Sequence, residues 1–225
     1  MNDIGRLVWL GVPAMGCLGR NRMERKDFDA DALTWDEEPR RVRLAADIAA
    51  AIKESVPLSG DWDGMDYGCG TGLLTLDLAP ALRSIVGMDS SQGMVDRLNA
   101  KCTAAGIQNT RAVCCNLEQG EMPAGLFHLV ASAMTLHHIP ETVPLLTSLR
   151  GLLHPGGWIA LADLETEDGS FHDDQTGVFH HGFSREELEM FLARAGFRSI
   201  AVRSVTAVLK HEQLYPVLLA VAVRP

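Results

Sequence analysis

The chain has 225 residues, of which 47% are hydrophobic and 22% charged, and its formal net charge is −9. This length and composition suit one globular α/β domain and exclude a fibrous or disordered chain. A negative field repels phosphate groups, so we expect no nucleic acid and no anionic membrane as partner, and we favour a small neutral or cationic substrate.

The cysteines and the N-terminus bear on the compartment. The five cysteines include no CxxC pair, and an odd number does not form a disulfide framework. We therefore expect reduced thiols in a cytoplasmic protein, and no apolar run approaches the roughly 20 residues of a membrane helix. Residues 1–22 are apolar and rich in glycine. We interpret them as a loosely held extension before a single domain over 23–225, with a secretion signal ending at Cys17 as the alternative.

The first predicted element is a helix over residues 37–56, where apolar residues recur at helical spacing and Pro39 falls in the first turn. Short apolar runs then alternate with amphipathic stretches. The runs predict strands at 62–67, 84–88, 111–115, 126–133 and 158–162, and the stretches predict helices at 73–82, 92–105 and 142–153. This alternation indicates an α/β fold with a parallel sheet and crossover helices on both of its faces.

The last third of the chain has a different pattern. Residues 184–195 predict a helix, with Ser184 as N-cap, Glu187 completing a capping box and Gly196 after the end. Two apolar strands follow at 200–209 and 215–223. The link between them is too short for a crossover, so we expect the sheet to finish with an antiparallel hairpin.

A glycine-rich turn follows the first predicted strand. Gly68, Gly70 and Gly72 stand between that strand and the next helix, and Asp66 stands just before them. A sharp turn and a ligand lying against the backbone both need residues without Cβ, and a helix N-terminus offers N–H groups to an anion. The spacing differs from the G-x-G-x-x-G pattern of dinucleotide sites.

The second and third predicted strands also end in polar residues. Asp89 ends the second strand, where a carboxylate can accept hydrogen bonds from both hydroxyls of a ribose. A helix-capping role before Ser90 and Ser91 is the alternative. Asn116 ends the third strand, where its side chain can bond an adenine amino group.

Taken together, these motifs resemble those of the class I S-adenosylmethionine-dependent methyltransferases that act on small molecules, over about residues 28–196. The matching segments are Asp66-x-Gly68-x-Gly70-x-Gly72, Gly87-x-Asp89-x-Ser91 with Met94, Leu136-His137-His138-Ile139 and the turn at 152–157. The resemblance implies a Rossmann-like three-layer sandwich with a seven-stranded, mostly parallel sheet and an antiparallel C-terminal hairpin. It also implies S-adenosylmethionine as cofactor and S-adenosylhomocysteine as product.

The resemblance also implies roles for single residues. Asp66 would anchor the methionine end of the cofactor, Asp89 would hold the ribose, and Met94 would pack on the adenine. A segment similar to Phe28-x6-Trp35-Asp36 closes over the cofactor in many members. The implied cofactor-binding set is Asp66, Gly68, Gly70, Gly72, Asp89, Ser90, Met94, Asn116, Leu117 and Trp35. Asn116 and His128 stand where the family usually has acids.

The substrate side should follow the fourth and fifth strands, because ligands of open α/β sheets bind at the carboxyl ends of the strands. Candidate side chains there are His137, His138, Asp163, Glu165, His172, Asp173, Asp174, His180 and His181. We choose His138 and His181 as catalytic candidates, with a structural role as the alternative for each. The polar stretch 165–183 has the length of a lid. No pair has His-x3-His or HExxH spacing, so we expect no metal.

The sequence thus predicts a methyltransferase, monomeric or homodimeric, that acts on an unidentified small molecule. An NAD(P)-dependent oxidoreductase is one alternative, although the glycine spacing and the lack of a Tyr-x3-Lys pair oppose it. A non-catalytic cofactor-binding protein of the same fold is the other.

Overall fold

The computed structural model describes residues 27–121 and 123–225, so the predicted extension at 1–22 lies outside the described residues. Seven strands form one sheet in the order β3-β2-β1-β4-β5-β7-β6. The strands are β1 (Asp63–Tyr67), β2 (Ser84–Asp89), β3 (Thr110–Cys114), β4 (Phe127–Ala133), β5 (Leu153–Leu164), β6 (Arg198–Lys210) and β7 (Gln213–Val223). Strands β1 to β5 run parallel, whereas β7 is antiparallel to both β5 and β6. The predicted fold class is confirmed.

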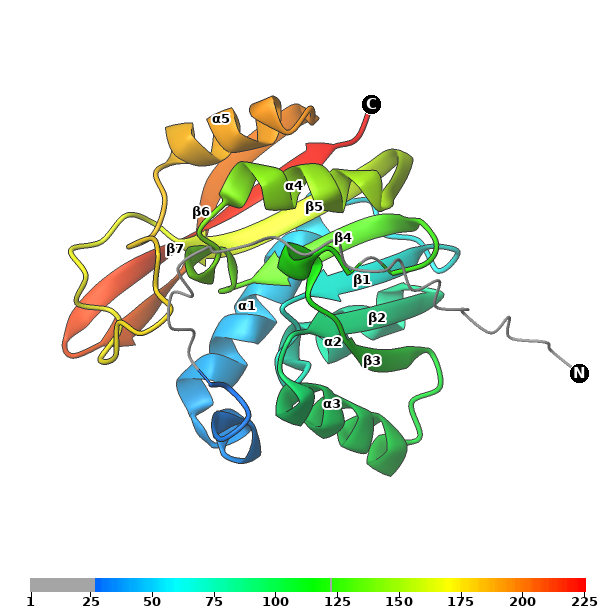
Figure 1. Cartoon of the computed structure of the whole chain (residues 1–225), viewed down its shortest axis with the longest axis horizontal. Helices are drawn as coiled ribbons and strands as arrows, with labels where there is room; N and C mark the ends of the chain where they lie inside the picture. The colour runs from blue at the N-terminus through cyan, green and yellow to red at the C-terminus, as the bar shows by residue number, and fades with distance from the viewer. Residues whose placement is uncertain (1–26, 122) are drawn as a thin grey trace, which may run out of the picture.

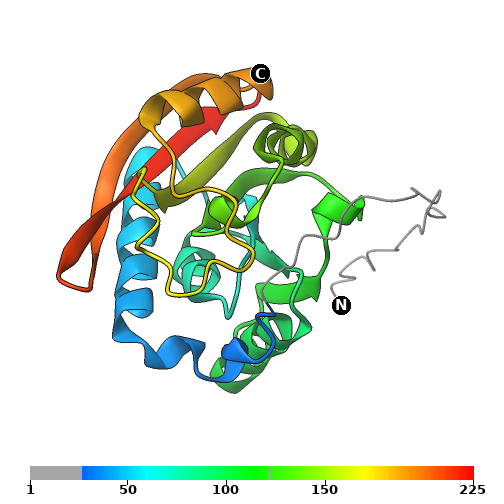
Figure 2. The ribbon, with the colours of Figure 1, turned by 60° about the vertical axis from the view of Figure 1, so that its left-hand side comes forward.

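Helices cover both faces of this sheet (Figures 1 and 2). The longer helices are α1 (Pro39–Ser55), α2 (Leu73–Leu78), α3 (Gln92–Ala105), α4 (Thr142–Gly151) and α5 (Arg185–Arg194). Short 3-10 turns are η1 (Asp31–Leu33), η2 (Trp35–Glu37), η3 (Ala79–Ala81), η4 (Leu117–Gln119) and η5 (Leu136–His138). Successive strand residues alternate between the faces: Leu129 and Ala131 pack with α1 and α2, while Val130 packs with α4 and α5. The core is therefore split into two layers by the sheet.

Several local predictions are confirmed at their boundaries. The predicted helix 92–105 is α3, and Pro39 is the first residue of α1. The capping box of α5 is present, because the Ser184 hydroxyl accepts from the Glu187 N–H and the Glu187 carboxylate accepts from the Ser184 N–H. The two-residue turn between β6 and β7 has positive φ at His211 and Glu212, as a tight hairpin requires.

Other boundaries differ for identifiable reasons. Helix α2 ends at Leu78 instead of 82, because Pro80 lacks the N–H that would continue the helical ladder. Strand β5 begins at Leu153 instead of 158, and a register shift against β4 takes up the Pro155-Gly156-Gly157 turn. Helix α4 accordingly stops at Gly151.

Two expectations, reduced thiols and the lack of a membrane helix, can be compared with the residues that the structure describes. Cys69, Cys102, Cys114 and Cys115 are free thiols, and Cys17 lies outside the described part. Within 27–121 and 123–225, no helix combines the length and the apolar character that a bilayer crossing requires.

Candidate active site

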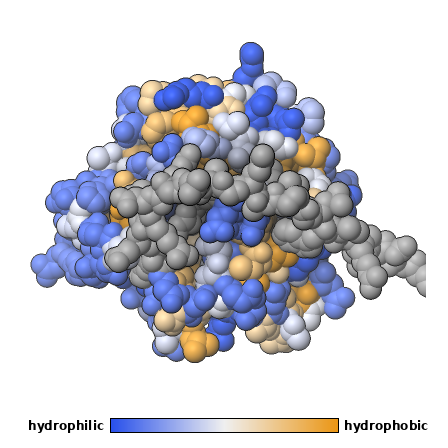
Figure 3. All heavy atoms as spheres, in the orientation of Figure 1, coloured by the Kyte–Doolittle hydropathy of each residue, from blue (hydrophilic) through white to orange (hydrophobic). Residues whose placement is uncertain are grey.

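A cavity of about 440 Å³ opens at the carboxyl ends of β1, β2, β3 and β4. The strand order reverses direction between β1 and β4, which is where open α/β sheets bind ligands. The segment before α1, with Phe28 and Trp35, lines one side of the cavity, and residues 171–174 of the segment after β5 line another. In the view of Figure 3, the coloured part of the surface is mainly hydrophilic, with scattered apolar residues.

The glycine turn between β1 and α2 is held by close packing. Gly68 and Gly72 have φ of +69° and +86°, which side chains rarely adopt. A Cβ on Gly68 would lie 2.3 Å from the Thr135 hydroxyl oxygen, and one on Gly72 would lie 2.3 Å from a Leu98 methyl. Gly68 and Gly70 line the cavity, whereas Gly72 is not among its lining residues. Gly72 is therefore required by helix packing.

Asp89 joins the glycine turn to the end of β2. Its Oδ2 accepts from the Gly70 N–H at 2.8 Å, and its Oδ1 accepts from the Ser91 N–H at 2.9 Å. Burial raises the pKa of this carboxyl, although these backbone hydrogen bonds oppose the shift. The N-cap of α3 is Ser91, whose hydroxyl accepts from the Met94 N–H. The capping role is thus taken by Ser91, and Asp89 lines the cavity.

Asp66 lies almost fully buried at the wall of the cavity. Its Oδ2 accepts from the Thr75 hydroxyl at 2.5 Å, while no donor among the described residues reaches Oδ1. Burial raises the pKa of Asp66 to about 7. A buried carboxylate oxygen without a partner costs free energy, and a cationic donor would relieve that cost. The ammonium group at the methionine end of S-adenosylmethionine fits this requirement.

The segment before α1 is fastened to the same elements. The Asp36 carboxylate accepts from the Thr71 hydroxyl at 2.5 Å and pairs with Lys101 Nζ at 2.5 Å. The Asp29 carboxylate accepts from the Ser91 hydroxyl and the Gly93 N–H at the start of α3.

With the segment held in this way, its aromatic residues Phe28 and Trp35 line the cavity. Phe28 and Trp35 pack edge to face, with ring centroids 6.0 Å apart. The Arg41 guanidinium lies 3.7 Å from the centroid of the Trp35 ring and fixes its orientation. The segment therefore lies across the cofactor half of the cavity, where the resemblance puts a closing strap.

The remaining residues of the implied cofactor set divide into two groups. Ser90, Met94 and Asn116 line the cavity. Leu117 is buried in the core beneath it and is not a lining residue. Cys115, which is not in the implied cofactor set, does line it. Its neighbour Asn116 was chosen for its polar side chain, and residue type gave no reason to choose a thiol.

The substrate half contains a buried, hydrogen-bonded dyad. His137 and Asp163 are each 2% exposed, and His137 Nδ1 lies 2.7 Å from Asp163 Oδ1. Burial would raise the pKa of Asp163, but His137 and two backbone N–H groups hold it below its usual range. Asp163 comes from β5 and His137 from η5 after β4, so neighbouring parallel strands bring the pair together.

Two further histidines lie beside this dyad. His138 Nδ1 lies 2.8 Å from the Gly177 carbonyl oxygen, so Nδ1 carries the proton and donates it. The His172 ring lies 4.8 Å from the His137 ring and 5.8 Å from the His138 ring, centroid to centroid. Burial and the other two histidines lower the pKa of His172 to about 3, so this ring is neutral.

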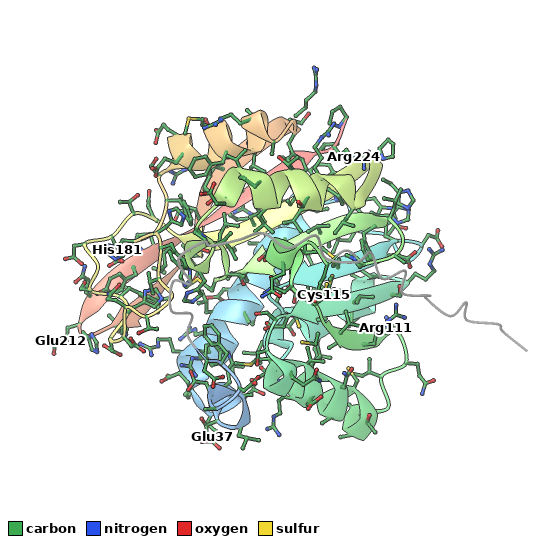
Figure 4. The ribbon with its side chains drawn as sticks, viewed as in Figure 1. Glu37, Arg111, Cys115, His181, Glu212 and Arg224 are labelled. Atoms are coloured by element: carbon green, nitrogen blue, oxygen red, sulfur yellow. The ribbon has the colours of Figure 1, made fainter. Side chains whose placement is uncertain are left out.

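His181, the second catalytic candidate, is not among the residues that line the cavity. Its Nε2 lies 3.2 Å from the Gln175 side-chain oxygen, and the residue is exposed. Figure 4 shows His181 at the outer edge of the molecule, well apart from Cys115. His128 lies at the opposite end of β4, where its Nδ1 accepts from the Asp63 N–H and its ring stacks on Trp62.

Comparisons with known proteins agree with this geometry. Residues 65–157 match the family profile described as a methyltransferase domain. An uncharacterized methyltransferase of Schizosaccharomyces pombe is 36% identical over 132 residues, which are 52% of this chain and 46% of that protein. A ubiquinone biosynthesis O-methyltransferase of Bordetella avium is 26% identical over 61% of this chain and 58% of its own. The chain thus spans about half the length of these relatives.

Solved structures agree on the fold. A S-adenosylmethionine-dependent methyltransferase from Aquifex aeolicus has a TM-score of 0.68 and 21% identity, covering 88% of this chain and 98% of that one. A putative methyltransferase of Haloferax volcanii, solved with the Trm112 activator, has a TM-score of 0.75 and 18% identity, covering 89% and 99%.

The sheet, the glycine turn and the strand-end carboxylate facing one cavity define a Rossmann-like protein of the nucleotide-cofactor class. Within that class, residues 65–157 are similar to the methyltransferase domain, and the Aquifex aeolicus protein of the same fold is a S-adenosylmethionine-dependent methyltransferase.

Proposed function

We propose that the protein transfers the methyl group of S-adenosylmethionine to a small molecule bound in the same cavity. One observation carries the proposal: the glycine turn with Asp66 and Asp89 and the histidines after β4 line a single cavity. A methyl donor held by the first group and an acceptor held beside the second would meet within it. Proximity and alignment supply much of the catalysis of such a displacement.

In the cofactor half, Asp66 would accept from the ammonium group and Asp89 from the ribose hydroxyls. Gly68 and Gly70 let the ligand lie against the backbone, and Met94 and Trp35 offer apolar surface to the adenine. Ser90 and Asn116 line the same wall and complete the proposed set. Gly72 and Leu117 would support it indirectly, through the packing of α2 and of the core.

In the substrate half, His138 is the proposed proton acceptor. Because its Nδ1–H donates to the Gly177 carbonyl, the neutral ring carries its basic lone pair on Nε2. His137 is the second candidate base, oriented by Asp163. A base is needed only where the acceptor atom carries a proton, so this arrangement favours a hydroxyl group over a thioether or a tertiary amine. His181 has no role in the proposal, since its side chain lies outside the cavity lining.

The substrate is proposed to be a small, largely apolar molecule. Phe28, Trp35, Phe171 and Ile139 line the cavity, and the negative net charge of the chain disfavours a polyanion. Relatives are named for O-methylation in ubiquinone biosynthesis and for methylation of 27-O-demethylrifamycin SV. We extend to this chain only the shared chemistry, transfer to a hydroxyl oxygen of a mainly apolar molecule.

Isothermal titration tests the cofactor, and a turnover assay tests the reaction. We expect S-adenosylmethionine to bind and NADH not to bind. A panel of small phenols and alcohols should contain members that release S-adenosylhomocysteine. Binding of NADH without binding of S-adenosylmethionine would overturn the proposal, and binding of S-adenosylmethionine without turnover across the panel would favour a non-catalytic protein of this fold.

A further inference from the structure

Three histidines meet at one point of the cavity wall. One ring nitrogen from each of His137, His138 and His172 lies within 4.8 Å of the others. His137 and His138 come from η5 after β4, and His172 comes from the segment that follows β5. All three line the cavity, so the shared point faces the ligand space. Neutral imidazole nitrogens are the common protein ligands of zinc and similar ions.

The orientation of His137 is fixed in the way that metal-binding histidines require. Its Nδ1 lies 2.7 Å from Asp163 Oδ1, and Asp163 also accepts from the His137 N–H at 3.2 Å. The carboxylate therefore sets the tautomer and leaves the lone pair on Nε2. Histidines that bind zinc usually donate their other ring N–H to a carboxylate or a backbone carbonyl, which orients the ring and raises its basicity.

His138 repeats this arrangement with a carbonyl in place of the carboxylate, since its Nδ1–H donates to the Gly177 oxygen at 2.8 Å. His172 supplies a different observation. Its Nδ1 is buried and has no hydrogen-bond partner within the described residues. A buried ring nitrogen without a partner is costly in a folded protein, and an ion would satisfy it.

A general base alone does not account for this cluster. One imidazole is enough to accept a proton, whereas here three rings lie together, with centroids 4.1 to 5.8 Å apart. Lys210, which lines the same cavity, is paired with Asp173 at 2.9 Å, so its charge is compensated. The buried carboxylate of Asp163 would in turn compensate a cation held at the three rings.

We propose that His137, His138 and His172 bind one divalent transition-metal ion, with Zn²⁺ as the best-matched ion, and that its remaining position faces the cavity. Three neutral nitrogen ligands with an open position form a geometry that zinc adopts at catalytic sites. Tetrahedral zinc with Zn–N bonds of about 2.0–2.1 Å keeps its ligand atoms about 3.3 Å apart. The three nitrogens, now within 4.8 Å of one another, would draw together to that separation around the ion.

The role of the ion rests on the proposed function, and it replaces the proton-acceptor role of His138, because the single lone pair of that ring cannot hold a proton and an ion at once. The hydroxyl oxygen of the acceptor binds at the open position, where the metal lowers its pKa and the proton leaves to solvent or a nearby base. The resulting oxyanion attacks the methyl carbon of S-adenosylmethionine. The O–CH₃ bond forms as the S⁺–CH₃ bond breaks, and the electron pair stays on the sulfur of S-adenosylhomocysteine.

The test titrates the chelator-treated full chain with ZnCl₂, and with CoCl₂ to record the visible absorption of tetrahedral cobalt. We expect one ion per chain, and His172→Ala and His138→Ala should each weaken binding at least about tenfold. His172→Gln serves as a second variant with a side chain of similar volume. His181→Ala is the matched control, because it removes a histidine of the same segment outside the cavity lining. Absence of binding, or binding that these variants leave unchanged, would overturn the metal site.

A second measurement separates this proposal from the proposed function. S-adenosylhomocysteine affinity should stay within about threefold on adding Zn²⁺ or on His172→Ala, since no cofactor contact is assigned to that ring. Zinc binding that responds to the variants supports the metal site even where the acceptor panel gives no turnover. Turnover that persists at full rate without any bound metal would overturn the metal's role and leave methyl transfer standing.

Discussion

The cofactor half and the substrate half of the cavity are built in different ways. In the cofactor half, Asp66, Gly68, Gly70 and Asp89 lie in or directly after β1 and β2, and backbone hydrogen bonds join them. In the substrate half, His137, Asp163, His172 and Gly177 come from three separate segments and meet through side chains. Positions at strand ends are set by the sheet, whereas positions in a long connection depend on what the connection packs against. The first half should therefore tolerate changes in the second.

Asp163→Ala should have the largest effect and should act on the substrate half. Asp163 accepts from His137 Nδ1–H and from the N–H groups of His137 and Leu164, and each buried donor left without a partner costs about 1–3 kcal/mol. Urea unfolding of Asp163→Ala measures this loss, and the exposed carboxylate variant Asp61→Ala is the control. A loss below about 1 kcal/mol would mean that the dyad is not a structural centre of this half.

His138→Ala should lower turnover about a hundredfold or more, as expected for loss of a proton acceptor or of a metal ligand, with little change in cofactor affinity. The acceptor assay and titration with S-adenosylhomocysteine give the two numbers. His181→Ala in the same assays tests the remaining sequence prediction. A comparable loss of turnover in His181→Ala would mean that His181 acts in catalysis although its side chain lies outside the cavity lining.

Asp89→Ala should act on the cofactor half alone. We expect cofactor affinity to fall at least about tenfold, or about 1.4 kcal/mol, because the ribose loses its acceptor and the Gly70 N–H loses its partner. Calorimetric titration measures this, with Asp89→Asn as the variant that keeps one acceptor oxygen. Unchanged affinity in Asp89→Ala would separate the glycine turn from the cofactor.

The smallest expected effect is the release of protons by Asp66 when the cofactor binds, and this release depends on pH. Its pKa of about 7 in the folded chain lies above that of an exposed carboxyl. Protonation of Asp66 thus favours the folded state at low pH, and this contribution is lost as pH rises through about 7. The cationic cofactor needs the ionised form, so its binding at pH 7 should release about half a proton.

Calorimetry in two buffers of different ionisation enthalpy measures the protons released on binding. Asp66→Asn should abolish the release and remove the rise of cofactor affinity between pH 6 and about 8. A release that persists in Asp66→Asn would assign the proton to another group of the cavity.

Local patterns in the sequence were enough for most of the fold. Helix α3 and the capping box of α5 follow from spacing and from residue type within a few positions. The glycine turn follows because Gly68 and Gly72 need positive φ, a local requirement. The start of β5 at Leu153 was not predicted, since pairing with Phe127 of β4 extends the strand through a turn-forming sequence.

The site residues that the sequence predicts lie at strand ends, whereas those that it misses or misplaces lie in longer connections. Asp66, Asp89 and Asn116 could be selected because each stands at a strand end, and such positions converge in any parallel sheet. The sequence predicts no metal because no ligand pair is closely spaced along the chain. His172 stands 34 residues after His138, so spacing gives no sign that the two rings meet. His181 was chosen for its place in the same segment, and the structure puts its side chain on the outside.

By itself, the sequence determined the order of strands and helices along the chain, the glycine turn and the resemblance to a methyltransferase domain, because these depend on periodicity and on short-range conformational limits. Only the tertiary structure decided which histidines share the cavity. The segment after β5 is held by contacts from distant parts of the chain: the N–H groups of Phe179 and His180 donate to the His137 carbonyl, and Lys210 donates to that of Phe171. Such contacts carry no spacing signal, since they form between residues whose separation along the chain is arbitrary.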